Sequence, residues 1–189
     1  MQHKLNLSIN DYKKFYQIEL EIIPLPNHYG KFINVTEGED SNYQFFFNNK
    51  KKEINRNYLK ENENVQKIIV ILDYKISSFY NLFNGCECIE SISFKFFYTE
   101  YIINMKNMFY GCTFLKMINF LSFNSENVTD MSYMFYNCSS LKELNISNFT
   151  SQNIKNEYSI LSMFDGCSSL INRPKFKQIG TFQDKCAFY

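Results

Sequence analysis

A repeated pattern of apolar residues constrains this 189-residue chain more than any other feature. The motif Met-x-x-Met-Phe-Tyr-x-Cys at residues 105–112 returns at residues 131–138. Two more divergent copies end at Cys86 and Cys167, so the four anchoring cysteines are 26, 26 and 29 residues apart. Such a period is typical of proteins in which short units stack on one another. The sequence therefore predicts a repeat protein of about four units.

The residues before each anchoring cysteine have helical spacing. Apolar side chains stand at i, i+3, i+4 and i+7, which lines one face of a helix about two turns long. A residue type that caps helices precedes each segment, and one that tolerates a left-handed backbone precedes each cysteine. The pattern predicts a short helix in every unit. The apolar positions are Phe79, Leu82, Phe83, Cys86; Met105, Met108, Phe109, Cys112; Met131, Met134, Phe135, Cys138; and Ile160, Met163, Phe164, Cys167. The predicted helix caps are Ser78, Asn104, Asp130 and Ser159. The residues predicted to end the helices are Gly85, Gly111, Asn137 and Gly166.

After each cysteine the apolar period becomes alternating, as expected of a short strand that buries every second residue. One unit cannot bury its own apolar face, so the units are expected to stack, with parallel strands about 4.8 Å apart. The strand positions are Ile89, Ile92, Phe94; Leu115, Ile118, Phe120; and Leu141, Leu144, Ile146, and further apolar columns follow at Phe97, Phe123, Phe149 and at Ile102, Val128, Ile154.

Residues 128–154, VTDMSYMFYNCSSLKELNISNFTSQNI, resemble the BspA-like leucine-rich repeats, whose pattern is M-x-x-M-F-x-x-C-x-x-L-x-x-L-x-[LI]-S-x-F-x-T-x-x-[VI]. The resemblance extends over roughly residues 76–171. It implies a leucine-rich-repeat solenoid and, for many members, adhesion or protein binding, and it brings no catalytic residues. The chain departs from the pattern at Phe79 and Leu82, which replace two methionines, in a longer third connector, and in lacking a secretion signal.

We therefore predict an α/β fold, a leucine-rich-repeat solenoid of short helices and stacked parallel strands with a β-rich N-terminal cap. Residues 1–64 are predicted to be the β-rich cap or a small domain, because strand-like runs alternate there with turn signals. Residues 65–171 are predicted to be the solenoid, and the apolar run from Val65 its first buried strand. Arg173 and Pro174 interrupt the pattern, so residues 172–189 are predicted to be a C-terminal cap or tail.

Charge and composition exclude several function classes. The 20 basic and 19 acidic residues leave a net charge of +1, which provides no field to recruit nucleic acid or an anionic membrane. No apolar run approaches the roughly 18–20 residues of a membrane span. The first residues lack the apolar core of a signal peptide, so a cytoplasmic location is predicted, with a cell-surface or secreted one as the alternative.

Catalytic and cofactor chemistry is not expected. The two histidines, His3 and His28, lie outside the repeats, so no base stands near their Ser and Cys residues. The scattered glycines form no phosphate-binding loop. We predict that the protein is not an enzyme and has no catalytic, cofactor-binding or metal-binding residues.

The cysteines of the repeats are predicted to be buried free thiols, whereas the sixth cysteine, Cys186, lies in the tail and has no counterpart in the repeats. Zinc sites favour closely spaced pairs, whereas the repeat cysteines occupy the same slot a full unit apart. Neighbouring units come within disulfide range, but the side chains would point the same way. Reduced thiols also fit an intracellular setting. The alternatives are redox activity at Cys86 and Cys88, and glycosylation at one of the six Asn-x-Ser/Thr sequons, among them Asn34.

The outward-facing residues of the stacked strands form the candidate binding face. An exposed methionine and Leu121 among small polar residues suit protein recognition, although an ordinary solvent-facing surface is the alternative. We predict a non-enzymatic module that binds a protein partner through this face of the repeat sheet, with a surface or secreted adhesin of the same repeat family as the alternative. The face residues are Ser91, Ser93, Met117, Asn119, Glu143 and Asn145, flanked by Lys95, Leu121 and Ser147.

Overall fold

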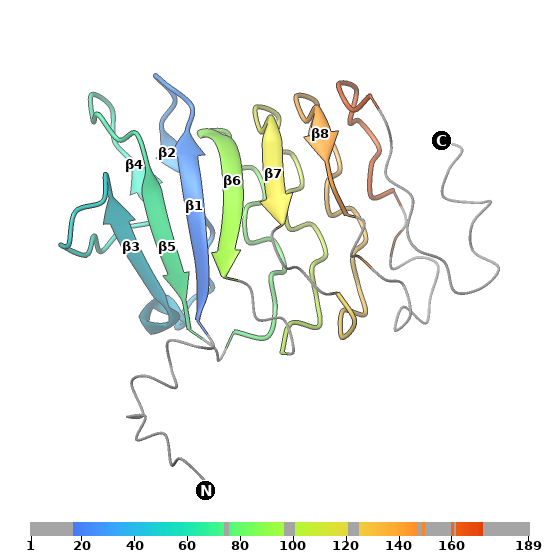
Figure 1. Cartoon of the computed structure of the whole chain (residues 1–189), viewed down its shortest axis with the longest axis horizontal. Coiled ribbons are helices and arrows are strands. Elements are labelled where there is room, and N and C mark those ends of the chain that lie inside the picture. Colours follow the sequence, from blue (N-terminus) through green and yellow to red (C-terminus); the bar gives the residue numbers. More distant parts are fainter. Residues whose placement is uncertain are drawn as a thin grey trace, which may run out of the picture.

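The computed structural model describes residues 17–73, 76–96, 101–120, 125–146, 149, 160 and 162–171. A six-stranded mixed sheet with the order β3-β5-β1-β6-β7-β8 runs through them (Figure 1). A two-stranded antiparallel sheet of β2 and β4 lies beside it. The strands are β1 (Ile18–Pro24), β2 (Gly30–Lys31), β3 (Tyr43–Phe47), β4 (Tyr58–Leu59), β5 (Ile68–Leu72), β6 (Ile89–Phe96), β7 (Met117–Phe120) and β8 (Glu143–Leu144).

The N-terminal strands β3, β5 and β1 form the antiparallel half of this sheet. Strand β1 pairs with β5 on one side and with β6 on the other, so that Leu20 lies opposite both Val70 and Phe94. Its burial alternates, with Ile18, Leu20 and Ile22 inward, as a strand with one face on the core requires. The expectation that β5 is the first rung of the parallel stack is wrong, because β1 lies between β5 and β6.

The repeat strands β6, β7 and β8 form the parallel half. Ile92 lies opposite Ile118, and Ile118 lies opposite Leu144, so equivalent residues of successive units align. The division of the chain into residues 1–64, 65–171 and 172–189 stays a prediction, and the last of these segments lies outside the described residues.

The predicted α/β solenoid of short helices is wrong. The described residues contain no α-helix; the 3₁₀ turn η1 spans Asp40–Asn42, far from the predicted helices. The reason lies in the third residue of each supposed helix, which has a positive φ where a right-handed helix cannot continue. The residues and their φ angles are Asn81 (57°), Asn107 (56°), Tyr133 (56°) and Ser162 (52°).

Each of these segments is instead a pair of consecutive turns. In the first unit the Leu82 N–H donates to the Phe79 carbonyl, and the Cys86 N–H donates to the Phe83 carbonyl. Asn81 and Gly85 occupy the third position of these turns with positive φ, as in type II turns. We call the segments at residues 78–86, 104–112, 130–138 and 162–167 the four turn segments.

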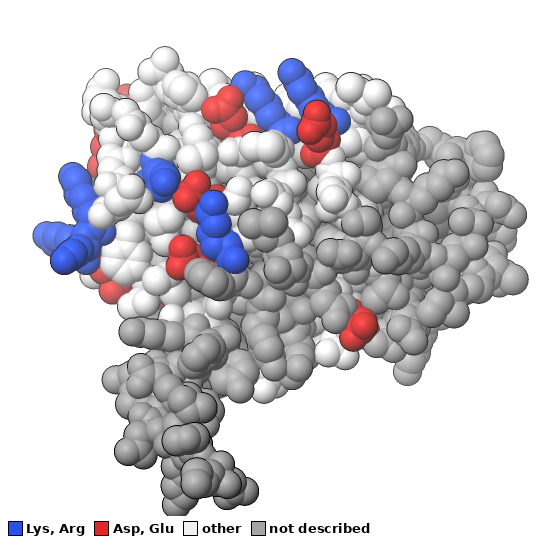
Figure 2. All heavy atoms as spheres, in the orientation of Figure 1, with Lys and Arg blue, Asp and Glu red and all other residues white. Residues whose placement is uncertain are grey.

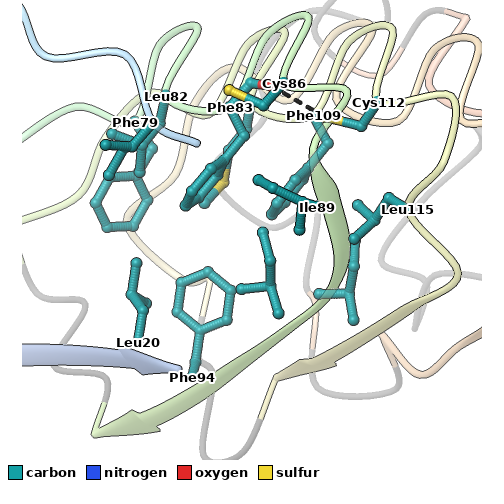
Figure 3. Close-up of a cluster of buried hydrophobic side chains, with 14 of the residues drawn as sticks. Leu20, Phe79, Leu82, Phe83, Cys86, Ile89, Phe94, Phe109, Cys112 and Leu115 are labelled. Atoms are coloured by element: carbon teal, nitrogen blue, oxygen red, sulfur yellow. Dashed lines mark hydrogen bonds between the residues drawn. The ribbon is translucent and has the colours of Figure 1, made fainter. Parts of the chain in front are cut away.

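The hydrophobic core lies between the sheet and the turn segments (Figure 3). The inward residues of the first turn segment are all at most 2% exposed, although they come from turns. One phenylalanine from each segment forms a column of nearly parallel rings. The centroid distances are 5.3 Å for Phe83–Phe109, 5.5 Å for Phe109–Phe135 and 5.7 Å for Phe135–Phe164.

Candidate functional site

Hydrogen bonds between the turn segments determine how the units stack. The N–H of Phe83 donates to the carbonyl of Met108, and that of Gly85 donates to Tyr110, both at 2.8 Å. The next segment repeats the arrangement, with Phe109 donating to Met134. We call these bonds the turn ladder. A helix would use such N–H groups internally, whereas here each unit requires the next one to accept them.

The residues predicted as helix caps have a related role in the turns. The Ser78 hydroxyl accepts the Tyr80 N–H at 3.1 Å, and the Asn104 side chain accepts the Lys106 N–H at 2.9 Å. Asp130 repeats the contact in the third unit. The side-chain oxygens therefore accept backbone N–H groups two residues on, as caps do, but they stabilise a turn. Ser159 lies outside the described residues.

The repeat cysteines join neighbouring turn segments through their thiols. Cys112 Sγ donates to the Phe83 carbonyl at 2.9 Å (Figure 3), and Cys138 Sγ donates to the Phe109 carbonyl at 3.1 Å. Cys167 makes the same contact to Phe135 at 3.0 Å. The five described cysteines are free and buried, as predicted, and Cys186 lies outside the described residues.

Burial keeps these thiols protonated at neutral pH. Desolvation, with a smaller contribution from neighbouring cysteines, raises the pKa of Cys86, Cys112 and Cys138 well above the ordinary value. Desolvation raises the pKa of Cys88 to about 11. Because the thiolate is the reactive form, the arrangement disfavours the redox alternative at Cys86 and Cys88.

Asn34 caps the N-terminal end of the turn ladder, a role that sequence reasoning missed. Its Nδ2 donates to the carbonyls of Asn81 and Asn84, both at 2.9 Å, and its backbone N–H donates to Leu82 at 2.7 Å. Among the described residues no unit precedes the first turn segment, and this loop residue supplies two of the donors that such a unit would supply, to the carbonyls of Leu82 and Asn84. A glycan on Nδ2 would disrupt this cap, which argues against use of the Asn34 sequon.

Replacing Asn34 with Asp is therefore expected to lower the free energy of unfolding by about 2 kcal/mol, because two carbonyls lose their donors and face a carboxylate. Urea denaturation at pH 7 measures the change. Asn62→Asp is the control, since it makes the same chemical change at an exposed asparagine. Equal stability of the two variants would show that Asn34 is not a cap.

The six predicted face residues lie on the side of the sheet that points away from the core. Ser91, Met117 and Glu143 form one registered row across β6, β7 and β8, and Ser93 lies opposite Asn119 in the next row. Met117 is 50% exposed, whereas Ser91 and Ser93 are half-buried. The other three residues are exposed, with Asn145 directly after β8. Of the flanking residues, Lys95 is exposed, and Leu121 and Ser147 lie outside the described residues.

The face continues onto the N-terminal strands. Glu21 of β1 lies opposite Ser93, and Ile23 lies opposite Ser91. We call the outward side of β1, β6, β7 and β8 the outer face. One group of charges on this face is paired, since Glu21 lies 3.3 Å from Lys67, just before β5, and 3.8 Å from Lys95. In Figure 2, acidic and basic side chains accordingly lie side by side in small groups.

In the part of the chain that the structure describes, no group of three or more His, Cys, Asp or Glu side chains could hold a metal ion. Within the same residues, no helix is long and apolar enough to cross a membrane.

Comparison with protein families gives a match over residues 77–184 to the family described as "Mycoplasma protein of unknown function, DUF285". The match covers more than half of the chain. The chain belongs to the DUF285 family. This family is associated with BspA-like repeats, so the resemblance holds at that level, whereas the leucine-rich nature of the repeat stays a prediction. No curated protein and no solved structure matches the chain.

Proposed function

We propose that this DUF285 protein is a non-enzymatic interaction module that binds a protein partner through the outer face. The observation that carries the proposal is the half-exposed Met117 in the middle of the row from Ser91 to Glu143. A flexible apolar side chain with small polar neighbours is a suitable anchor for a partner, because it can fill a pocket of varied shape.

The surroundings of Met117 support this use. Ser91 and Asn119 have short side chains, so the methionine is accessible from above the sheet. Its backbone is fixed by pairing with β6 and β8, which lowers the entropy lost on binding. The resemblance to BspA-like leucine-rich repeats, many of which bind proteins, agrees with this proposal. The pairing of β1 with β6 widens the face beyond the three repeat strands, towards the area that a specific complex needs.

The double substitution Met117→Arg and Asn119→Arg is expected to weaken partner binding by at least about 30-fold, since it places two charges at the centre of the interface. Both positions are exposed, so the fold should tolerate the change. A partner captured from native extract with the wild-type chain would be purified and titrated against both forms by calorimetry.

Tyr80→Arg is the matched control, because Tyr80 is 51% exposed but lies in a turn segment rather than on the sheet. The control should bind as the wild type does, and circular dichroism should show that both variants are folded. Full binding by the Met117/Asn119 variant would exclude the outer face as the binding surface.

A further inference from the structure

The C-terminal end of the turn ladder differs from every earlier step. The last turn segment accepts bonds from the third, with Phe135 donating to Met163 at 3.1 Å and Asn137 donating to Asp165 at 2.7 Å. By the pattern of the earlier units, Phe164 and Gly166 should donate to a following unit. Among the described residues, no group accepts the N–H of either residue. Two aligned donors therefore end the ladder in the part of the chain that the structure describes.

The phenylalanine column ends in the same place. Phe83, Phe109 and Phe135 are fully buried, at 0% exposure, whereas Phe164 is only partly buried. The Phe164 ring packs on Phe135 in a nearly parallel stack. Nearby in sequence, Ile171 is 82% exposed. The partly buried Phe164 ring therefore lies in the same turn segment as the two N–H donors, just as a phenylalanine accompanies the donors in each earlier segment.

The opposite end of the ladder is closed. Asn34 donates to the carbonyls of Leu82 and Asn84, which are the acceptors that Phe164 and Gly166 of a preceding copy would engage by the pattern of Phe83 to Met108 and Gly85 to Tyr110. A second copy of the chain therefore cannot extend the ladder from head to tail through Phe164 and Gly166, because the two carbonyls that would accept from them, those of Leu82 and Asn84, already accept from Asn34. Two copies meeting at their C-terminal ends would place donors against donors. The hydrogen-bond polarity excludes both kinds of self-association.

We propose that the C-terminal end of the turn ladder is a docking edge for a segment of a different polypeptide with the same repeat character. Such a segment supplies backbone carbonyls at alternate residues to the N–H groups of Phe164 and Gly166. It also places an aromatic or apolar side chain over the Phe164 ring, and a thiol or other donor on the Phe164 carbonyl, as Cys167 does on Phe135. This is the addition of one more turn segment to an open row of backbone donors, by the same logic as the addition of a strand to a sheet edge, and it is independent of the outer face.

The probe is a reduced synthetic peptide with the sequence of residues 129–149, which carries the Met-x-x-Met-Phe motif. Amide hydrogen exchange of the full chain is followed by NMR, with the Phe109 and Gly111 amides as internal references. In the free chain, Phe164 and Gly166 should exchange at least about tenfold faster than the references. A saturating amount of the peptide should slow them by at least about tenfold. The same peptide with Phe135→Asp should have no effect.

Phe164→Ala provides the second arm, since Phe164 belongs to the terminal unit and its loss should leave the rest folded. This variant should bind the peptide at least about tenfold more weakly, while the protection of Phe109 stays unchanged. Two results would overturn the proposal. Phe164 and Gly166 amides as protected as the references in the free chain would show that the chain closes this end itself. Exchange unaffected by the peptide would show that the edge takes no such segment.

Discussion

Raising the pH from 7 to 10 is expected to bring this protein close to unfolding. Cys86, Cys88, Cys112 and Cys138 are at most 1% exposed, and desolvation raises the pKa of each thiol. In the unfolded chain a cysteine ionises near pH 8.5. Since the folded pKa is the higher one, the stability is complete below about pH 8.5 and is lost as the pH rises towards the folded pKa.

The expected size of this loss follows from proton linkage. Each buried thiol costs about 1.4 kcal/mol of stability per pH unit above about pH 8.5, or about 2 kcal/mol at pH 10. Four thiols together cost about 8 kcal/mol, which is comparable to the whole stability of about 5–15 kcal/mol of an ordinary domain. Urea unfolding at pH 7, 8.5 and 10 measures the loss. Tyr43, whose pKa desolvation and then Glu39 raise to about 12, adds to it only above pH 10.

Cys112→Ala is the control that assigns this loss to the thiols. The variant is less stable at pH 7, because the hydrogen bond to the Phe83 carbonyl is gone. Its loss of stability between pH 7 and pH 10 should nevertheless be smaller than that of the wild type by about 2 kcal/mol. Parallel losses in the two proteins would mean that Cys112 ionises as easily in the folded chain as in the unfolded one.

The repeat pattern predicted burial well and backbone geometry badly, for one physical reason. Apolar spacing reports which side chains face inward, and two consecutive turns bury the same four positions as a two-turn helix. Asn81 and Asn107 were a usable signal, because asparagine tolerates the left-handed conformation that ends a helix. The third and fourth units gave no such signal, because tyrosine and serine do not favour a left-handed backbone, although Tyr133 and Ser162 both adopt it.

Contacts between distant segments could not be predicted from local patterns. The insertion of β1 between β5 and β6 depends on pairing of strands far apart in the sequence. Asn34 is likewise 47 residues from Asn81, the residue it caps. The rows of the candidate face could be predicted, because a constant interval of 26 residues places Ser91, Met117 and Glu143 in register.

Replacing Phe109 with alanine is expected to lower the free energy of unfolding by about 3–5 kcal/mol. The ring is fully buried and has stacked neighbours on both faces, Phe83 at 5.3 Å and Phe135 at 5.5 Å. It also meets the Phe120 ring edge-on at 6.3 Å, so a collapse of one unit into the cavity would strain the sheet as well as the turns. Thermal and urea denaturation measure the change.

Tyr110→Ala separates the effect of burial from that of stacking. Tyr110 follows Phe109 in the same turn segment and stacks on Tyr136 at 4.8 Å, but it is 37% exposed. Its loss should therefore cost only about 1 kcal/mol. Similar losses in both variants would mean that stacking along the repeat axis stabilises the units whether or not the rings are buried. A much larger loss for Phe109→Ala would show that the buried phenylalanine column, and not ring stacking as such, holds successive units together.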